Sequence, residues 1–358
     1  MLGHRLFLFY GGSGMEMKRI QEYSSKTSLA MANVYHSVMK VYPNCISDIN
    51  SDKDYYLGVK QATLISPALL AFLGENGFHF HTLDKASHKG RGIDFQLKNP
   101  LTGKAMTGSS SGTALNVFLG INDIGIGTDG GGSVLSPAAT LNLIGMIHPA
   151  FGANWVDFQM YKKVSTDNVV FTPSIGFISR KLQLVEEVAT LFVETEMEKK
   201  EVKVAIDANI EKEKWASWEI VADIRSRNFA YKYEASREEL IDEVEALFTE
   251  VDIIVSKEGP IDVDGMGETL FGHFDTQTRA TQVQGKKGFV RVINMCNAIG
   301  LIVPAGELAT GYLIIARPQH GLEKTVFQLA ELLIAKEDPL VANYFLDHHA
   351  YFEEGYSS

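Results

Sequence analysis

The sequence predicts an α/β protein in which a mixed β-sheet core is covered by helices on both faces. Short apolar runs typical of buried strands recur along the chain, and segments with helical spacing of apolar residues lie between them. This alternation is typical of a sheet packed against helices on each side. With 358 residues, 45% of them hydrophobic, the chain is long enough for a large core, and we expect a single domain over 1–358 with its core at about 38–335.

Each element is predicted from a local signal. Ser66 and Pro67 suit the N-cap and the first position of a helix that ends at Gly77. Apolar stripes predict two more helices whose buried faces are core, at Leu182, Val185, Val188 and Phe192, and at Val326, Leu329, Ala330 and Leu333. Strands are predicted at 124–126, 202–206, 253–255 and 313–316.

The ends and the charged middle of the chain carry weaker signals. The apolar run near the N-terminus is too short for a signal-peptide core or a membrane span. Residues 1–20 are expected to be disordered in part. The charged stretch 194–250 predicts exposed helices. Only Cys45 and Cys296 are present, which predicts buried thiols in a reducing compartment, and the cytoplasm is the expected location.

Charge and composition limit the classes of molecule that the protein is expected to bind. A net charge of −11 argues against nucleic acid or an anionic membrane, and a small molecule is the expected partner, with a homo-oligomer left open. No cofactor motif is present. His79, His81 and His88 lack a Cys or carboxylate at ligand spacing, so no metal is expected.

Residues 107–137 contain two serine clusters set among glycines. Gly130, Gly131 and Gly132 run into Ser133, and successive amides without Cβ atoms can point into one concavity that holds an oxyanion. A serine hydroxyl needs a neighbouring proton acceptor to become a nucleophile, and Ser109 could pass the proton onward to a third group.

These clusters resemble the two motifs of the amidase signature family. The chain has TGSSSG at 107–112 and GTDGGGS at 127–133, with no gap needed between them. The resemblance implies the amidase signature fold, with Ser133 as the nucleophile and Ser109 as the bridging serine that the family holds in a cis peptide. It makes Ser110 a supporting hydrogen-bond partner, while Thr128 and Asp129 are expected to hold the shape of the loop.

The resemblance also implies a lysine base at the end of a short apolar strand. The segment 36–41 is the chosen match, which makes Lys40 the expected base, with Lys53 and Lys60 as alternatives. A lysine is a base only when neutral, so burial must lower its pKa. Further similarity to the family at 164–192 and 289–333 extends the match over most of 38–335.

The chain departs from the family pattern at several positions. Thr107 and Ser111 replace glycines, Leu135 stands where an arginine normally follows the nucleophile, and 148–149 and 256–258 differ as well. The chain is also short for the family, in regions that normally form the acyl pocket, so the substrate is the property that the sequence predicts least well.

A rival interpretation takes GSSSG at 108–112 as the nucleophile elbow of an α/β-hydrolase. In this interpretation Ser110 is the nucleophile and His148, His273 or His320 is the histidine of the triad, but the second serine cluster has no role. GIGTDG at 125–130 fits a dinucleotide-binding pattern but lacks the acidic residue expected about 20 positions later.

The sequence therefore predicts a serine amidase that hydrolyses a linear amide through an acyl-enzyme on Ser133. Three alternatives stay open: an inactive amidase-like binding protein, a subunit that delivers ammonia to a partner enzyme, and an esterase with the same machinery.

Overall fold

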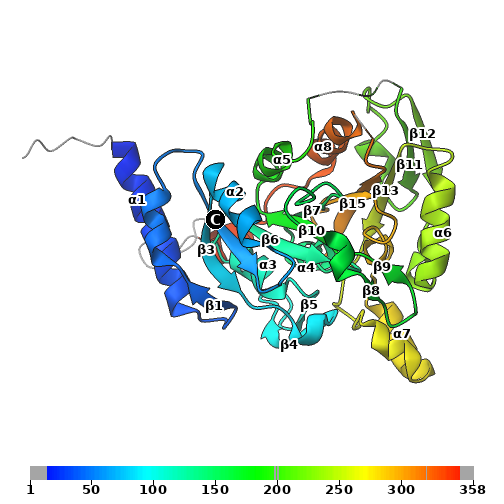
Figure 1. Ribbon diagram of the computed structural model, residues 1–358. Coiled ribbons are helices and arrows are strands. Elements are labelled where there is room, and N and C mark those ends of the chain that lie inside the picture. The colour runs from blue at the N-terminus through cyan, green and yellow to red at the C-terminus, as the bar shows by residue number, and fades with distance from the viewer. Residues whose placement is uncertain (1–13, 197–198, 200, 320, 347–358) are drawn as a thin grey trace, which may run out of the picture.

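The computed structural model describes residues 14–196, 199, 201–319 and 321–346 (Figure 1). Within them the centre is a sheet of 11 strands in the order β1-β3-β2-β6-β10-β7-β14-β15-β13-β11-β12. Strand β2 is parallel to β3 and β6, and β11 is parallel to β12 and β13, while the other neighbours are antiparallel. The predicted mixed sheet is confirmed.

The strands of this sheet are short and mostly buried. They are β1 (Val38–Val41), β2 (Tyr55–Lys60), β3 (Phe78–Asp84), β6 (Ile124–Asp129), β7 (Ile144–Ile147), β10 (Ser174–Ser179), β11 (Lys203–Asp207), β12 (Asp223–Arg227), β13 (Ile253–Glu258), β14 (Ile299–Pro304) and β15 (Gly311–Ala316). Two separate hairpins pair β4 (Ile93–Lys98) with β5 (Ala105–Thr107) and β8 (Lys163–Val164) with β9 (Val170–Phe171).

Helices cover both faces of the sheet. They are α1 (Gly14–Ala32), α2 (Pro67–Glu75), α3 (Ser111–Phe118), α4 (Leu135–Thr140), α5 (Leu182–Thr190), α6 (Arg237–Leu247), α7 (Thr276–Gln284) and α8 (Leu322–Leu333). One apolar cluster joins α2, α5 and α8 to the sheet, and a second joins α3, α4 and α6 to it. Figure 1 shows α1 at the β1 edge and α7 projecting from the opposite half.

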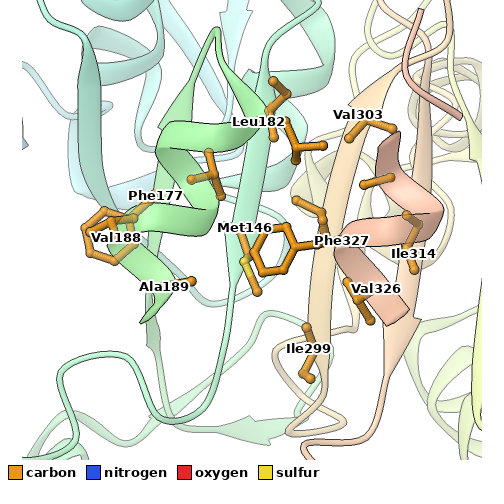
Figure 2. Packing of buried hydrophobic residues seen from close by; sticks show 14 of the residues in the cluster. Met146, Phe177, Leu182, Val188, Ala189, Ile299, Val303, Ile314, Val326 and Phe327 are labelled. Carbon is orange, nitrogen blue, oxygen red and sulfur yellow. The ribbon is translucent and has the colours of Figure 1, made fainter. Parts of the chain in front are cut away.

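The first cluster shows how the stripes predicted from sequence are used. In Figure 2, Phe327 of α8 lies beside Met146 of β7, and Val188 of α5 lies beside Phe177 of β10. Burying a large apolar side chain of this kind contributes about 1.5–3 kcal/mol. The two helices therefore hold the centre of the sheet, from which the strands run to the edge that bears the serine clusters.

The predicted elements are confirmed where their signals were local. Ser66 is the N-cap of α2, and its Oγ accepts a hydrogen bond from the amide of Leu69 at 3.2 Å. The four predicted strands correspond to β6, β11, β13 and β15.

Three expectations need correction. Helix α1 begins at Gly14, so the predicted disorder over 1–20 does not hold for 14–20, and 1–13 lie outside the described residues. In the charged stretch, 194–196 are not helical and 197, 198 and 200 are outside the description. Helix α6 does form, but it buries Leu240 and Val244, because its apolar residues recur at helical spacing. Cys45 is buried, whereas Cys296 is partly exposed.

No helix among the described residues is both long enough and apolar enough to cross a membrane.

Candidate active site

Two parallel strands bring the serine clusters and a lysine to one edge of the sheet. Strand β2 ends at Lys60, and its parallel neighbour β6 ends at Asp129 and leads into the glycine loop. Parallel neighbours end at the same edge, where sites in α/β proteins form. A cavity of about 860 Å³ opens there, and Lys60, Ser109 and Ser133 all line it.

Lys60 contacts the first serine cluster directly. Its Nζ lies 2.6 Å from Ser109 Oγ, 2.8 Å from Thr128 Oγ1 and 3.0 Å from the Thr128 carbonyl oxygen. The side chain is only 4% exposed. Burial lowers its pKa to about 7; the charge of Asp129 opposes this shift and that of Lys163 adds to it. A substantial fraction of Lys60 is therefore neutral near pH 7, able to accept a proton.

Lys40, the base expected from the sequence, does not lie at the site. It is exposed on the edge strand β1, with its Nζ 4.7 Å from the centre of the Tyr42 ring. Strands β3 and β2 separate β1 from β6. The expectation was wrong because the strand order, which the sequence does not show, puts the end of β2 and not of β1 beside β6.

The signal that could have found Lys60 is present in the sequence. The apolar run 55–59 ends at Lys60, 49 residues before Ser109, in the strand-then-lysine pattern by which Lys40 was chosen. Lys53, the other alternative, lies in the exposed turn before β2.

The glycine loop is held by one buried carboxylate. Asp129 Oδ1 accepts the amides of Gly131 (3.0 Å) and Gly132 (2.7 Å), and Oδ2 accepts those of Val134 (2.6 Å) and Leu135 (3.4 Å). Burial raises the pKa of Asp129, while these amides act in the opposite direction.

This arrangement changes the expected oxyanion donors. The amides of Gly131 and Gly132 are directed to Asp129, so they are not free to hold an oxyanion. Among the described residues, the amides of Gly130 and Ser133 have no protein partner. These two remain as candidate donors.

Two glycines are required by the geometry. Gly132 has φ +91°, and a Cβ there would lie 2.7 Å from the Val290 carbonyl oxygen. Gly108 has φ +72°, and a Cβ there would lie 2.5 Å from Pro137 Cδ. Both positions would be strained by any side chain. The missing Cβ of Gly108 lets the first cluster approach Pro137 and the Ser133 carbonyl group of the second.

The three serines have different surroundings. Ser133 is partly exposed, and within the described part of the chain its hydroxyl has no partner. Ser110 is fully buried at the N-cap of α3, with its amide donating to the Ser133 carbonyl oxygen at 3.2 Å and its Oγ 3.5 Å from the Thr128 carbonyl oxygen. No hydrogen bond joins the hydroxyls of Ser109 and Ser133.

The peptide bond before Ser109 differs from the expected cis form. Gly259–Pro260 is the only cis peptide among the described residues, so the bond before Ser109 is trans.

The departures from the family motif are accommodated by local contacts. Thr107 Oγ1 donates to Asp262, and Ser111 Oγ donates to Asp94 Oδ2 at 2.6 Å. Leu135 is fully buried in the second apolar cluster, where a guanidinium would have no partner or water. Each replaced residue is thus part of the packing around the loop.

The described part of the chain places no histidine for the nucleophile-elbow alternative. Within the described residues no histidine is hydrogen-bonded to Ser110. His148 is buried with its Nε2 3.5 Å from Glu323, His273 lines a separate small cavity, and His320 lies outside the described residues.

In the described part of the chain, no group of three or more His, Cys, Asp or Glu side chains is placed to bind a metal ion. His79 Nε2 instead lies 2.9 Å from Asp54, and His81 Nδ1 lies 2.8 Å from Asn122 Oδ1.

Comparison with known proteins gives a family match and a shared fold. Residues 91–154 match the Amidase family model. No curated protein matches the chain significantly in sequence.

Several solved structures are similar over most of the chain. A glutamyl-tRNA(Gln) amidotransferase subunit from Thermotoga maritima is 15% identical, with 88% of this chain and 93% of that one covered and a TM-score of 0.58. For 6-aminohexanoate cyclic dimer hydrolase the identity is 10%, the coverage 89% and 92%, and the TM-score 0.63. The K. lactis urea amidolyase is 14% identical with a TM-score of 0.58 over 87% of this chain, which spans only 26% of that protein. The match over 91–154 and the shared fold confirm the predicted resemblance to the amidase signature family.

Proposed function

We propose that the protein hydrolyses a carbon–nitrogen amide bond through an acyl-enzyme on Ser133, with Ser109 and Lys60 as the proton relay. The observation that carries this proposal is the 2.6 Å contact between Lys60 Nζ and Ser109 Oγ in the cavity that Ser133 lines. A buried lysine with a pKa of about 7 is suited to general-base catalysis near neutral pH.

The reaction begins when the Ser133 hydroxyl turns toward Ser109. Neutral Lys60 accepts the proton of Ser109, which takes the proton of Ser133 as Ser133 Oγ attacks the amide carbon. Apo sites commonly have such contacts open until substrate binds. The amides of Gly130 and Ser133 stabilise the tetrahedral oxyanion.

The intermediate then collapses and its carbon–nitrogen bond breaks. Protonated Lys60 returns the proton through Ser109 to the departing nitrogen, so the amine leaves neutral. Water, deprotonated by the same relay, attacks the ester of Ser133 and releases the acid. Asp129 keeps the loop in position throughout by holding Gly131 and Gly132.

The test is covalent labelling with a small uncharged fluorophosphonate, followed by peptide mass spectrometry. We expect labelling of the wild type at Ser133 only, none in Ser133→Ala, and much slower labelling in Lys60→Met. Lys40→Met serves as the matched control and should label like the wild type. Folded protein that does not label would contradict the proposal and favour an inactive binding protein or a subunit that works only with a partner enzyme.

An esterase would also label at Ser133. Matched ester and amide substrates separate the two, because an amidase retains measurable kcat/KM on the amide that an esterase lacks.

A further inference from the structure

The walls of the cavity are basic although the chain is acidic. Among the described residues that line it, Asp129 and Glu268 are the acidic side chains, whereas eight are lysines or arginines: Lys60, Lys85, Lys89, Arg91, Lys163, Arg237, Lys287 and Arg291. The whole chain has 33 Lys and Arg against 44 Asp and Glu. A cleft of one charge sign favours ligands of the opposite sign, so this cavity favours anions.

Among the described residues, neither acidic side chain forms an ion pair with a cation of the cavity, and both accept hydrogen bonds from backbone amides instead. The Asp129 carboxylate is occupied by four loop amides, and Glu268 accepts the amide of Gly92 at 2.6 Å. Several of the cations are likewise occupied. Lys287 pairs with Asp262 at 2.7 Å, and Arg291 donates to three backbone carbonyl groups.

Arg237 differs because two of its three guanidinium nitrogens have no hydrogen-bond partner within the described residues. It is the first residue of α6 and is 9% exposed. Its Nη1 donates to Asp167 Oδ1 at 2.8 Å. Within the described residues, Nε is buried without a hydrogen bond, and Nη2 has none either. Nε and Nη2 form one edge of the guanidinium, the geometry that takes a carboxylate through two parallel hydrogen bonds.

That edge is next to the proposed oxyanion loop. A Cβ built on Gly131 would lie 3.2 Å from Arg237 Nη2. Arg237 also lines a second cavity of about 130 Å³, so its guanidinium stands between the two cavities. A buried donor left unpaired is costly, and a ligand that pairs with it would gain both affinity and orientation.

We propose that the Nε–Nη2 edge of Arg237 binds a carboxylate of the substrate, so that the amide attacked by Ser133 belongs to an acidic molecule. This rests on the proposed function of Ser133. Four further cations of the cavity add long-range attraction for the same charge: Lys85, Lys89, Arg91 and Lys163.

The test measures binding to Ser133→Ala protein by titration calorimetry, so it does not depend on turnover. Succinamate is compared with the neutral succinamide, and N-propionylglycine with N-propionylglycinamide, which distinguishes a carboxylate on the acyl side from one on the amine side. We expect one acid to bind at least about tenfold tighter than its neutral partner, a difference of about 1.4 kcal/mol. Equal affinities in both pairs, or no binding of either acid, would overturn the proposal.

Variants assign the preference to Arg237. In Ser133→Ala/Arg237→Met the acid preference should fall to within about twofold, whereas Ser133→Ala/Arg317→Met should keep it, since Arg317 pairs with Glu245 outside the cavity. A preference that survives Arg237→Met contradicts the proposal.

Asp167→Asn provides a second measurement if Arg237→Met does not fold. It removes the anion that competes for Arg237 and leaves the guanidinium in place, so acid affinity should rise by about two- to fivefold. An unchanged or lower affinity counts against the proposal. The two proposals fail in different experiments. A protein that is not labelled by the fluorophosphonate contradicts the proposed reaction of Ser133, whereas acid binding is measured in Ser133→Ala protein and tests Arg237 separately.

Discussion

Lys60 Nζ and Ser109 Oγ lie 2.6 Å apart, although 49 residues separate them in the chain. The contact exists because β2 and β6 are parallel neighbours and β5 delivers the first serine cluster to the same edge. It joins a buried lysine of lowered pKa to the cavity that Ser133 lines, and the proposed mechanism depends on it.

Replacing Ser133 by alanine should abolish turnover and leave stability nearly unchanged. The hydroxyl has no hydrogen-bond partner within the described residues, so its removal should change the free energy of unfolding by less than about 0.5 kcal/mol. Urea denaturation and an amide hydrolysis assay measure the two effects. Persistent hydrolysis would mean that another residue is the nucleophile.

Lys60→Met should lower kcat/KM by about two to four orders of magnitude, because it removes the proposed general base. Lys40→Met, which changes an exposed residue, should leave kcat/KM within about twofold, like most surface substitutions.

In the wild type, kcat/KM should rise with pH through about 7, as Lys60 loses its proton, and then level off. A profile that is flat from about pH 5.5 to 9 would rule out Lys60 as the base.

Lys60 should also make stability depend on pH. Its pKa is about 7 in the folded protein against an ordinary value of 10.5, so between these values the unfolded chain binds more protons. The free energy of unfolding of the wild type relative to Lys60→Met should therefore increase with pH in this window, by at most about 1.4 kcal/mol per pH unit. Urea melts of both proteins at pH 7, 8 and 9 measure this slope, and a relative stability that falls with pH would show that the pKa of Lys60 is not depressed.

Asp129→Asn should destabilise the loop. An asparagine at this position can offer one oxygen, which leaves two of the four amides facing an NH₂ group, at about 1–3 kcal/mol for each unsatisfied donor. We expect a loss of about 2–4 kcal/mol in the free energy of unfolding. Asp157→Asn at an exposed cap is the control and should change it by about 0.5 kcal/mol at most. Equal effects of the two substitutions would show that Asp129 does not hold the loop.

Leu135→Arg should not improve the proposed activity, although it introduces the residue expected at this position from the resemblance to the amidase signature family. Leu135 is fully buried among apolar side chains, so an arginine there would be a charge without a partner. We expect a destabilisation of at least about 3 kcal/mol, with Leu135→Met costing less than about 1.5 kcal/mol. Thermal unfolding monitored by circular dichroism compares the two, and a stable, more active Leu135→Arg would mean that position 135 reaches the cavity.

Local patterns determined much of the fold. The Ser66–Pro67 signal, the apolar stripes of α5 and α8 and the four predicted strands depend on neighbouring residues, which is why they could be predicted. The two serine clusters were found for the same reason, since their glycines and serines lie within short motifs.

The tertiary structure decided what depends on the strand order and on packing between distant segments. It put Lys60 and not Lys40 beside Ser109, because β2 and not β1 neighbours β6. It directed two of the predicted oxyanion amides to Asp129, and it placed Arg237, more than a hundred residues later in the chain, against Gly131. Such contacts arise where separate elements pack together, and no spacing within the sequence records them.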